Sequence, residues 1–274
     1  MIREVTQKTG LPAVFAASVI ALALSSGAAL AQAASAEELA QQLSNPVADL
    51  VSVPFQLNYD ENIGLDDSGS RWTLNVQPVI PFSLNDDWNL ISRTILPFVS
   101  TDGIPAGAGS ETGLGDTVQS LFFSPKKPTA GGWIWGAGPV FLLPTSTSDT
   151  LGAGEWGAGL TGVALRQQGG WTYGGLANHI WDVGGDTDIN QTFLQPFVAY
   201  TTPSAWTFTL NSESTYNWET SEWSVPINAV ATKVTTIGDQ LVSLGGGLRY
   251  WAESPAGGPE GLGARVVLTV LLPR

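Results

Sequence analysis

The sequence predicts an all-β protein, namely a transmembrane antiparallel up-and-down β-barrel of about twelve strands with a short N-terminal helical segment. Three observations predict this fold class. Apolar and polar residues alternate with a period of two over a dozen segments, tryptophans stand at both ends of these segments, and tight turns alternate with longer loops. Together these features are typical of outer-membrane barrels, in which aromatic girdles mark both membrane interfaces.

The composition favours the same class. Only 13% of the 274 residues are charged, and no run of 18 apolar residues follows the N-terminal region, so we expect no transmembrane helix there. Strands with one face in lipid explain a chain that is poor in charge and yet has no such helix. The net charge of −13 argues against nucleic acid as a partner. Because the chain has no cysteine, its stability must come from hydrogen bonds and burial.

Residues 1–31 are predicted to be a secretory signal peptide. Arg3 and Lys8 form a short basic region, an apolar stretch covers residues 11–30, and Ala29-Leu30-Ala31 matches a cleavage site. The mature chain would then begin at Gln32 with a net charge of about −14. A retained membrane anchor is the alternative, which the Ala-rich composition and the cleavage pattern disfavour.

Residues 32–48 differ from the rest and are predicted to form an N-terminal helix or plug segment. Residues 37–43 are good helix formers, and Asn45-Pro46 ends the helix. If this segment folds inside the barrel, it would plug the lumen.

Residues 49–274 are predicted to form the barrel. The clearest alternation is near Trp72, where Trp72, Leu74 and Val76 share one face and Thr73 and Asn75 share the other. The predicted strands are 50–60, 70–83, 88–101, 113–124, 131–145, 154–168, 171–184, 189–202, 205–218, 222–235, 239–251 and 262–273.

The tryptophans are predicted to form two girdles. We expect the tight turns to face the periplasm together with both termini, because outer-membrane barrels have short periplasmic turns. A soluble β-sandwich is the alternative, but it has no reason to place tryptophans at both ends of successive strands. The predicted periplasmic girdle is Trp88, Trp133, Trp171 and Trp206, and the predicted outer girdle is Trp72, Trp156, Trp181, Trp218, Trp223 and Trp251.

Several stretches in combination carry a family resemblance. They are residues 45–48, 53–56, 77–82, 88–94, 113–116, 123–127, 138–140, 143–145, 195–197 and 213–216. With these stretches the chain resembles the bacterial outer-membrane transporter family catalogued under the meta-cleavage pathway of phenol degradation, some members of which are labelled neuromedin U. The resemblance implies a β-barrel and passage of aromatic or other hydrophobic small molecules. The chain departs from the usual aromatic C-terminus, which the barrel-assembly machinery reads, because it ends in Leu271-Leu272-Pro273-Arg274.

Strand alternation predicts which polar residues face the lumen. Facing lipid near the membrane midplane would cost an Arg or Lys about 2–4 kcal/mol, so charged residues within strands are expected to point inward. They would form either a polar constriction that selects solutes or a structural ion-pair network that fills a narrow lumen. Twelve strands favour the second, because such a barrel lies between small filled barrels and open porins. The predicted lumen residues are Arg93, Glu213, Arg249, Arg265, Asn75, Gln77, Asn211 and Asn228.

Acidic residues gather on or beside the predicted outer loops. Divalent cations held between such carboxylates could bridge to lipopolysaccharide phosphates. A solvated, repulsive rim is favoured, because no calcium-loop spacing is present. We therefore predict no metal site and no cofactor. The residues are Asp60, Glu61, Asp66, Asp67, Asp102, Glu111, Asp149, Asp186, Asp188, Glu253 and Glu260.

A barrel lipid hydrolase is the competing functional class. It would need a serine nucleophile, a histidine base and an orienting polar group. The chain has one histidine, His179, and no His-x-Ser pairing beside it, so a histidine at the membrane rim is favoured. The sequence therefore predicts a non-enzymatic channel or transporter for small solutes in the cell outer membrane, with a structural, plugged barrel as the alternative.

Overall fold

The barrel is built from short, regular strands. The computed structural model describes residues 35–185 and 188–272, so the predicted signal peptide lies outside the described residues. Within the described ranges, no helix is long and apolar enough to cross a membrane. The elements are α2 (Ala36–Leu43), β1 (Val51–Ile63), β2 (Gly69–Val76), β3 (Val79–Ser83), β4 (Trp88–Asp102), β5 (Glu111–Leu114), β6 (Thr117–Pro125), β7 (Trp133–Leu143), β8 (Gly157–Gln168), β9 (Trp171–Asp182), β10 (Asn190–Thr201), β11 (Trp206–Ser212), β12 (Ser214–Asn217), β13 (Glu222–Ile237), β14 (Gln240–Glu253) and β15 (Gly261–Leu272).

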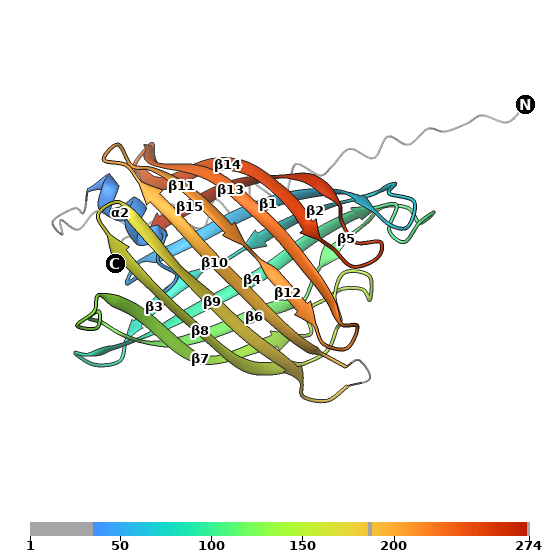
Figure 1. Ribbon diagram of the computed structural model, residues 1–274, viewed down its shortest axis with the longest axis horizontal. Helices are drawn as coiled ribbons and strands as arrows, with labels where there is room; N and C mark the ends of the chain where they lie inside the picture. The colour runs from blue at the N-terminus through green and yellow to red at the C-terminus, as the bar shows by residue number, and fades with distance from the viewer. Residues whose placement is uncertain (1–34, 186–187, 273–274) are drawn as a thin grey trace, which may run out of the picture. The chain divides into compact units, whose positions relative to one another are not determined.

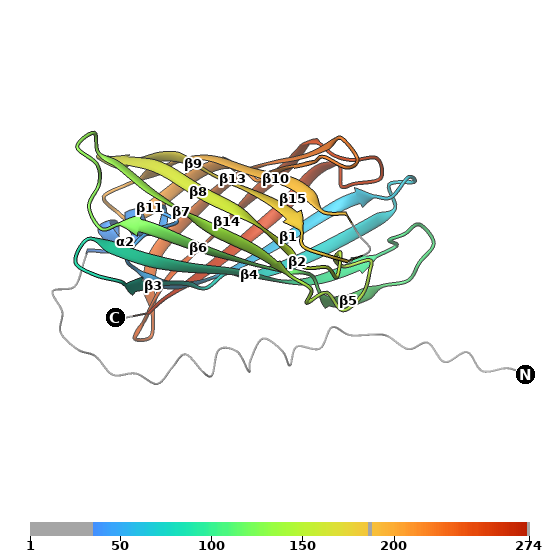
Figure 2. The ribbon, with the colours of Figure 1, turned by 90° about the horizontal axis from the view of Figure 1, so that it is seen from below.

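These strands form one closed antiparallel sheet (Figures 1 and 2). The first strand closes the sheet against the last, with a register that runs from Val51 opposite Leu272 to Tyr59 opposite Ala264. Three barrel strands are each interrupted, as β2/β3, β5/β6 and β11/β12. The barrel therefore has twelve strands, which confirms the predicted fold class and strand number.

Proline accounts for two of the interruptions. Pro78 separates β2 from β3, and Pro226 on β13 lies opposite Glu213, the residue between β11 and β12. Proline has no backbone N–H, so the hydrogen-bond ladder lapses at each position. The breaks are local, because Gln77 N–H still donates to the Pro54 carbonyl at 2.8 Å and Glu213 N–H donates to the Pro226 carbonyl at 3.2 Å.

The two faces of the barrel wall have opposite chemistry. On β8, Leu160 is 68% exposed whereas its neighbour Thr161 is 4% exposed, and on β14 Leu248 is 61% exposed whereas Arg249 is 8% exposed. Large apolar side chains thus cover the outside, and polar ones are buried inside. This is the inverse of a soluble protein and is what a barrel surrounded by lipid requires.

The two ends of the barrel differ in loop length. One end, the short-turn end, carries the connections 84–87, 126–132, 169–170, 202–205 and 238–239. The other, the long-loop end, carries 64–68, 103–110, 144–156, 183–189, 218–221 and 254–260, with residues 186–187 outside the described ranges. Helix α2 and the last described residue of β15 both lie at the short-turn end (Figure 1).

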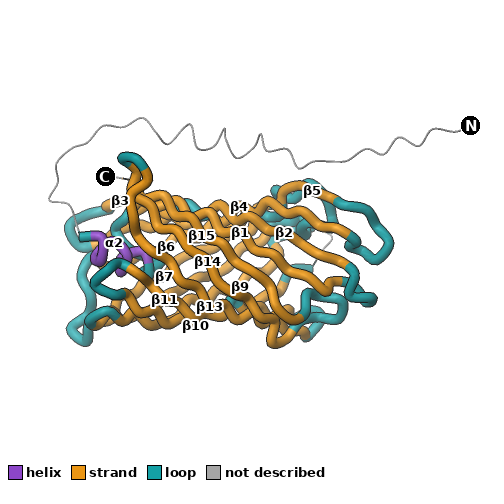
Figure 3. The backbone as a smooth tube through the Cα atoms, turned by 90° about the horizontal axis from the view of Figure 1, so that it is seen from above, coloured by secondary structure: helices purple, strands orange, loops and turns teal. Residues whose placement is uncertain are grey.

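The segment before the barrel folds back against the barrel interior. Helix α2 begins at Ser35, whose side chain and that of Glu38 cap each other's backbone N–H groups. Its buried Ala40 packs with Ala205 and Val234. The helix lies at the short-turn end of the barrel (Figure 3). The expected helix therefore forms, at residues 36–43.

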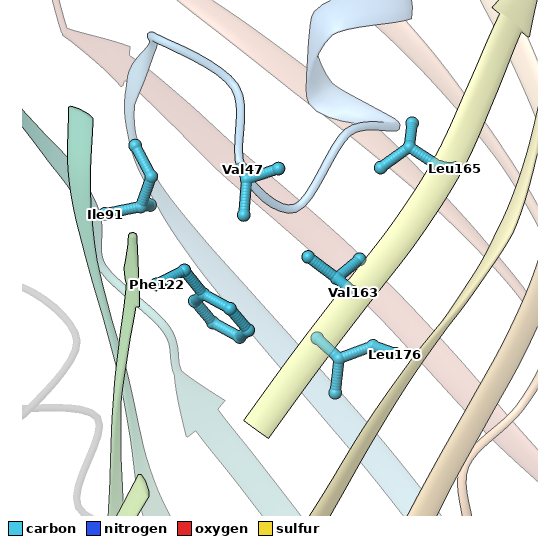
Figure 4. Packing of buried hydrophobic residues seen from close by; sticks show 6 residues of the cluster. All are labelled: Val47, Ile91, Phe122, Val163, Leu165 and Leu176. Atoms are coloured by element: carbon cyan, nitrogen blue, oxygen red, sulfur yellow. The ribbon is translucent and has the colours of Figure 1, made fainter. Parts of the chain in front are cut away.

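The chain after α2 contributes to an apolar core inside the barrel. Val47 packs with inward side chains from β4, β6, β8 and β9 (Figure 4). These side chains point into the barrel and cannot contact lipid. They are therefore buried against one another and against the N-terminal segment. The cluster consists of Val47, Ile91, Phe122, Val163, Leu165 and Leu176.

Candidate functional site: the barrel lumen

A carboxylate on β1 gathers three side chains toward the long-loop end of the lumen. Asp60, which is 2% exposed, lies 3.5 Å from Arg71 Nη2 and 3.1 Å from Arg249 Nε. Its Oδ1 atom also accepts a hydrogen bond of 2.8 Å from the indole N–H of Trp251. The Arg249 Nε–H does not point at the carboxylate well enough for a hydrogen bond, so that contact is an ion pair. Asp60 thus ties β1 to β2 and β14.

A second carboxylate forms the centre of the network. Glu213 accepts two parallel hydrogen bonds from the Arg265 guanidinium, at 2.9 and 2.7 Å, and lies 3.7 Å from Arg249 Nη1. Arg265 Nε also donates to Asn58 Oδ1 at 2.7 Å. Such a bidentate pair fixes both side chains. Because Glu213 stands between β11 and β12, it reaches across β13 and β14 to β15.

Arg93 lies outside this network. Its Nη2 atom donates to Gln77 Oε1 at 3.2 Å. Among the residues that the structure describes, no carboxylate lies within ion-pair distance of Arg93, whereas Arg71, Arg249 and Arg265 each have one. Arg93 is therefore a lumen cation that no counter-charge neutralises directly.

The amides predicted for the lumen are also inside. Asn228 is fully buried and its Nδ2 atom donates to Asn211 Oδ1 at 2.9 Å. Asn75 lies on the lumen face of β2, whereas the exposed Trp72 lies on the other face of the same strand. Gln77, which is buried, completes this polar wall.

A cavity of about 250 Å³ lies between the N-terminal segment and these polar residues. Its lining is mixed: the segment and β3, β10, β13 and β15 supply apolar side chains, and the surrounding strands supply amides, hydroxyls and two arginines. The apolar members that matter below are Leu43, Val79, Phe197 and Val267, and the cationic members are Arg93 and Arg265.

The lumen therefore has two unlike sides. One side, formed by β1, β2, β14 and β15 with Glu213, carries the ion pairs. The other side, formed by β4, β6, β8 and β9, carries the apolar cluster around Val47. The cavity lies where Arg93 and Gln77 meet apolar side chains such as Val79 and Phe197.

Of the predicted lumen residues, Gln77, Arg93, Asn211 and Arg265 line the cavity, and Asn228 and Arg249 are buried. Two other predictions need correction. Asp60 does not belong to the acidic outer rim, because it is buried in the ion-pair network. Trp251 does not face lipid: its N–H binds Asp60, and its ring lies 4.7 Å from the Arg249 guanidinium carbon. Trp251 and Arg249 are two residues apart and therefore lie on the same face of their strand. Because Arg249 points inward, Trp251 does so too.

The sequence interpretation also missed Arg71 as a lumen residue. The sequence pattern could have predicted it, because Arg71 lies on the same polar face of β2 as Thr73 and Asn75. Its partner Asp60 lies opposite it in the β1–β2 register.

Most of the remaining tryptophans occupy the outer surface near the strand ends. Trp88, Trp133, Trp171 and Trp206 begin strands at the short-turn end, and Trp88 packs edge-on against Trp135. At the long-loop end, Trp72, Trp156, Trp181 and Trp218 are each about half exposed, and the Trp223 ring lies tilted against Tyr216 with their centroids 4.9 Å apart.

His179 lies on this outer surface, beside Trp181. Its Nδ1 atom is 2.7 Å from the Thr192 hydroxyl, which also accepts a hydrogen bond from Trp218 Nε1. The Nε2 atom is buried without a hydrogen-bond partner in the structure. A hydrolytic triad needs an orienting group on that second nitrogen, and none of the described residues supplies one.

Two of the described acidic loop residues bind neighbouring hydroxyl groups. Asp102 accepts a hydrogen bond from Ser110, and Glu111 accepts one from Thr150. Among the described residues, no group of three or more acidic, histidine or cysteine side chains could hold a metal ion.

Comparison with known proteins identifies the fold. No protein-family model matches the sequence, and no curated protein matches it. Among solved structures, the COG4313 outer membrane channel from Pseudomonas putida F1 is similar with a TM-score of 0.61 and 15% identity, over 81% of this chain and 94% of that one. Outer membrane phospholipase A from Escherichia coli has a TM-score of 0.45 at 13% identity, over 88% and 99%. The β domain of the Bordetella autotransporter BrkA has a TM-score of 0.42 at 10% identity, over 81% and 100%.

These likenesses show the fold alone. The chain is a closed β-barrel of the outer-membrane type, and its fold is similar to that of the Pseudomonas putida channel. The phospholipase and the autotransporter, with TM-scores below 0.5, are too dissimilar to indicate an activity for this chain.

Proposed function

We propose that this protein is an outer-membrane channel or transporter that lets small solutes cross the barrel lumen. The observation that carries the proposal is the cavity of about 250 Å³ between the N-terminal segment and the arginine-rich wall. A barrel with a purely structural role has no need of an internal space lined by both apolar and polar side chains. The fold shared with an outer membrane channel supports the same class.

The solutes are small and hydrophobic or aromatic. The apolar side of the lumen, which includes Phe122 and Phe197, supports this class, and so does the family resemblance of the sequence. In the membrane the short-turn end faces the periplasm and the long-loop end faces outward, as the loop lengths favour. The polar residues of the lumen act as a selectivity constriction.

The N-terminal segment is the gate in this proposal. Val47 fills the apolar side of the lumen, and Gln41 exchanges hydrogen bonds with the Gly169 carbonyl and the Gln167 side chain at the short-turn end. A solute that leaves the cavity toward the periplasm must pass this segment. These two hydrogen bonds involve side-chain amides and not the strand ladder, so breaking them leaves the ladder intact.

Uptake by proteoliposomes tests the proposal. The mature protein is reconstituted and exposed to neutral aromatic and aliphatic solutes of similar size, with empty liposomes as the control. We expect faster entry of the aromatic solutes than in empty liposomes. A rate equal to that of empty liposomes for every solute would reject the channel and leave a structural barrel.

The same proposal includes the envelope partners. The exposed tryptophans anchor the barrel in outer-membrane lipid, and the acidic loops approach lipopolysaccharide through divalent cations. In this proposal the barrel-assembly machinery inserts the chain into the outer membrane. Removal of divalent cations by a chelator should lower the lipopolysaccharide that co-purifies with the protein, and an unchanged amount would contradict the bridge.

A further inference from the structure

We propose that the lumen cavity binds a small organic carboxylate, with the carboxylate on Arg93 and an apolar body about the size of one aromatic ring against Phe197 and Val79. This inference rests on the proposed channel function and narrows its solute class from hydrophobic molecules to amphipathic anions. It follows from the placement of one arginine, the charge of the lumen wall and the size of the cavity.

The first observation is the unpaired charge of Arg93. The other three lumen arginines each have a carboxylate within 4 Å, whereas the Arg93 guanidinium donates its hydrogen bond to the neutral amide of Gln77 and has no carboxylate within 4 Å among the described residues. A guanidinium has five N–H donors, and a carboxylate is its best bidentate partner. Arg93 lines the cavity, so these donors are available to a molecule inside it.

The second observation is the charge of the lumen wall near the cavity, whose own lining includes Arg93 and Arg265. With Arg71, Arg249, Asp60 and Glu213, these side chains sum to +2 in a chain whose total is −13. Both carboxylates are already engaged by the other three arginines. Glu213 also attracts Arg93 electrostatically, but it is held by two hydrogen bonds from Arg265, so an anion beside Arg93 gains attraction from both cavity-lining arginines.

The third observation is the shape of the remaining space. An apolar cavity of about 150 Å³ is enough to hold benzene, so about 250 Å³ accommodates one ring with a short polar substituent. Phe197, Val79 and Val267 provide apolar contacts for the ring. An inorganic anion would leave these surfaces uncovered, and a neutral hydrocarbon would leave Arg93 without a charged partner. A single molecule with both parts satisfies both.

Calorimetry on the mature protein in detergent tests the site with three probes. Benzoate has the ring and the charge, benzyl alcohol has the ring alone, and acetate has the charge alone. We expect benzoate to bind at least about tenfold more tightly than either of the others, because each lacks one of the two contacts. Equal affinity of benzoate and benzyl alcohol, or of benzoate and acetate, would overturn the proposal.

Two variants assign the contacts. Arg93→Gln should weaken benzoate binding about ten- to hundredfold, as expected for the loss of charge-assisted hydrogen bonds. Arg166→Gln is the matched control, because Arg166 lies outside the lumen against Trp133, 5.8 Å from its ring centre, and it should bind benzoate normally. Phe197→Ala should weaken benzoate and leave acetate unchanged. Circular dichroism confirms that each variant is folded, and an unchanged benzoate affinity in folded Arg93→Gln would overturn the assignment.

Binding and passage are measured separately, so the two proposals can fail separately. If benzoate binds through Arg93 but proteoliposomes admit no solute, the site stands and the channel does not. If solutes enter the proteoliposomes but Arg93→Gln binds benzoate like the unaltered protein, the channel stands and the carboxylate site is wrong.

Discussion

At the scale of single residues, the lumen shows how a buried charge is made tolerable. Arg265 is 3% exposed and satisfies its guanidinium with two hydrogen bonds to Glu213 and one to Asn58. Removing one partner of a buried pair costs more than the pair contributes, because the other charge stays behind without compensation. The energetic role of this network is therefore best tested by removing its acid.

Glu213→Gln should destabilise the barrel. It leaves Arg265 and Arg249 without their shared carboxylate, at a cost of about 1–3 kcal/mol, a range that allows for partial screening because Glu213 is 19% exposed. The free energy of unfolding in urea, measured in lipid bilayers, checks this. Glu219→Gln, on an exposed turn, is the control and should change it by less than about 0.5 kcal/mol. Equal effects of the two variants would contradict the network.

The variant Trp251→Phe tests whether Trp251 has a role in the lumen that differs from that of the girdle tryptophans. The change keeps an aromatic ring beside Arg249 but removes the N–H that binds Asp60, so we expect a loss of about 0.5–1.5 kcal/mol of unfolding free energy. Trp156→Phe, on the exposed outer surface, should instead reduce fluorescence quenching by brominated lipids, whereas Trp251→Phe leaves that quenching unchanged. Loss of lipid quenching in Trp251→Phe would place its ring in the membrane.

At the scale of elements, alternation predicted the strands well because each strand has one lipid face and one lumen face. It could not predict which lumen residues meet. Glu213 and Arg265 lie 52 residues apart, and parity gives a side chain's face but neither its depth nor its angle around the barrel. The same limit explains why Arg93 was grouped with the paired arginines. Pro78 and Pro226 were visible in the sequence, but their local breaks depend on the partner strands.

The N-terminal segment is the element whose movement the channel proposal requires. Val47 lies against β7, where a Cβ built on Gly136 would be 3.3 Å from Val47 Cγ1. That spacing suits a disulfide in a chain that has no cysteine of its own. In Val47→Cys with Gly136→Cys, oxidation should block solute uptake by proteoliposomes and reduction should restore it. Each single-cysteine variant is the control. Uptake unaffected by oxidation, with the disulfide verified by mass spectrometry, would show that the segment need not move.

At the scale of the whole molecule, charge is divided between the ends and the interior of the barrel. The long-loop end carries acidic residues such as Asp66, Asp149 and Glu260, whereas the charged lumen side chains described above, four arginines and two carboxylates, sum to +2. Loop charges act through water, where dissolved salt screens them. The Debye length, over which their field decays, is about 30 Å at 0.01 M salt and about 3 Å at 1 M. Charges in a narrow lumen act on an ion at contact distance and are screened far less. The two regions should therefore dominate ion selectivity under different conditions.

The reversal potential of the channel in planar bilayers should depend on ionic strength. At 0.01 M potassium chloride the acidic loops concentrate cations at the long-loop entrance and lower the preference for anions. At 1 M their field is screened, and the lumen arginines should shift the reversal potential toward that of chloride. Arg93→Gln should reduce this shift because it removes half of the net lumen charge. A reversal potential that moves toward that of potassium as salt rises would contradict this division of charge, because the lumen would then favour cations once the loops are screened.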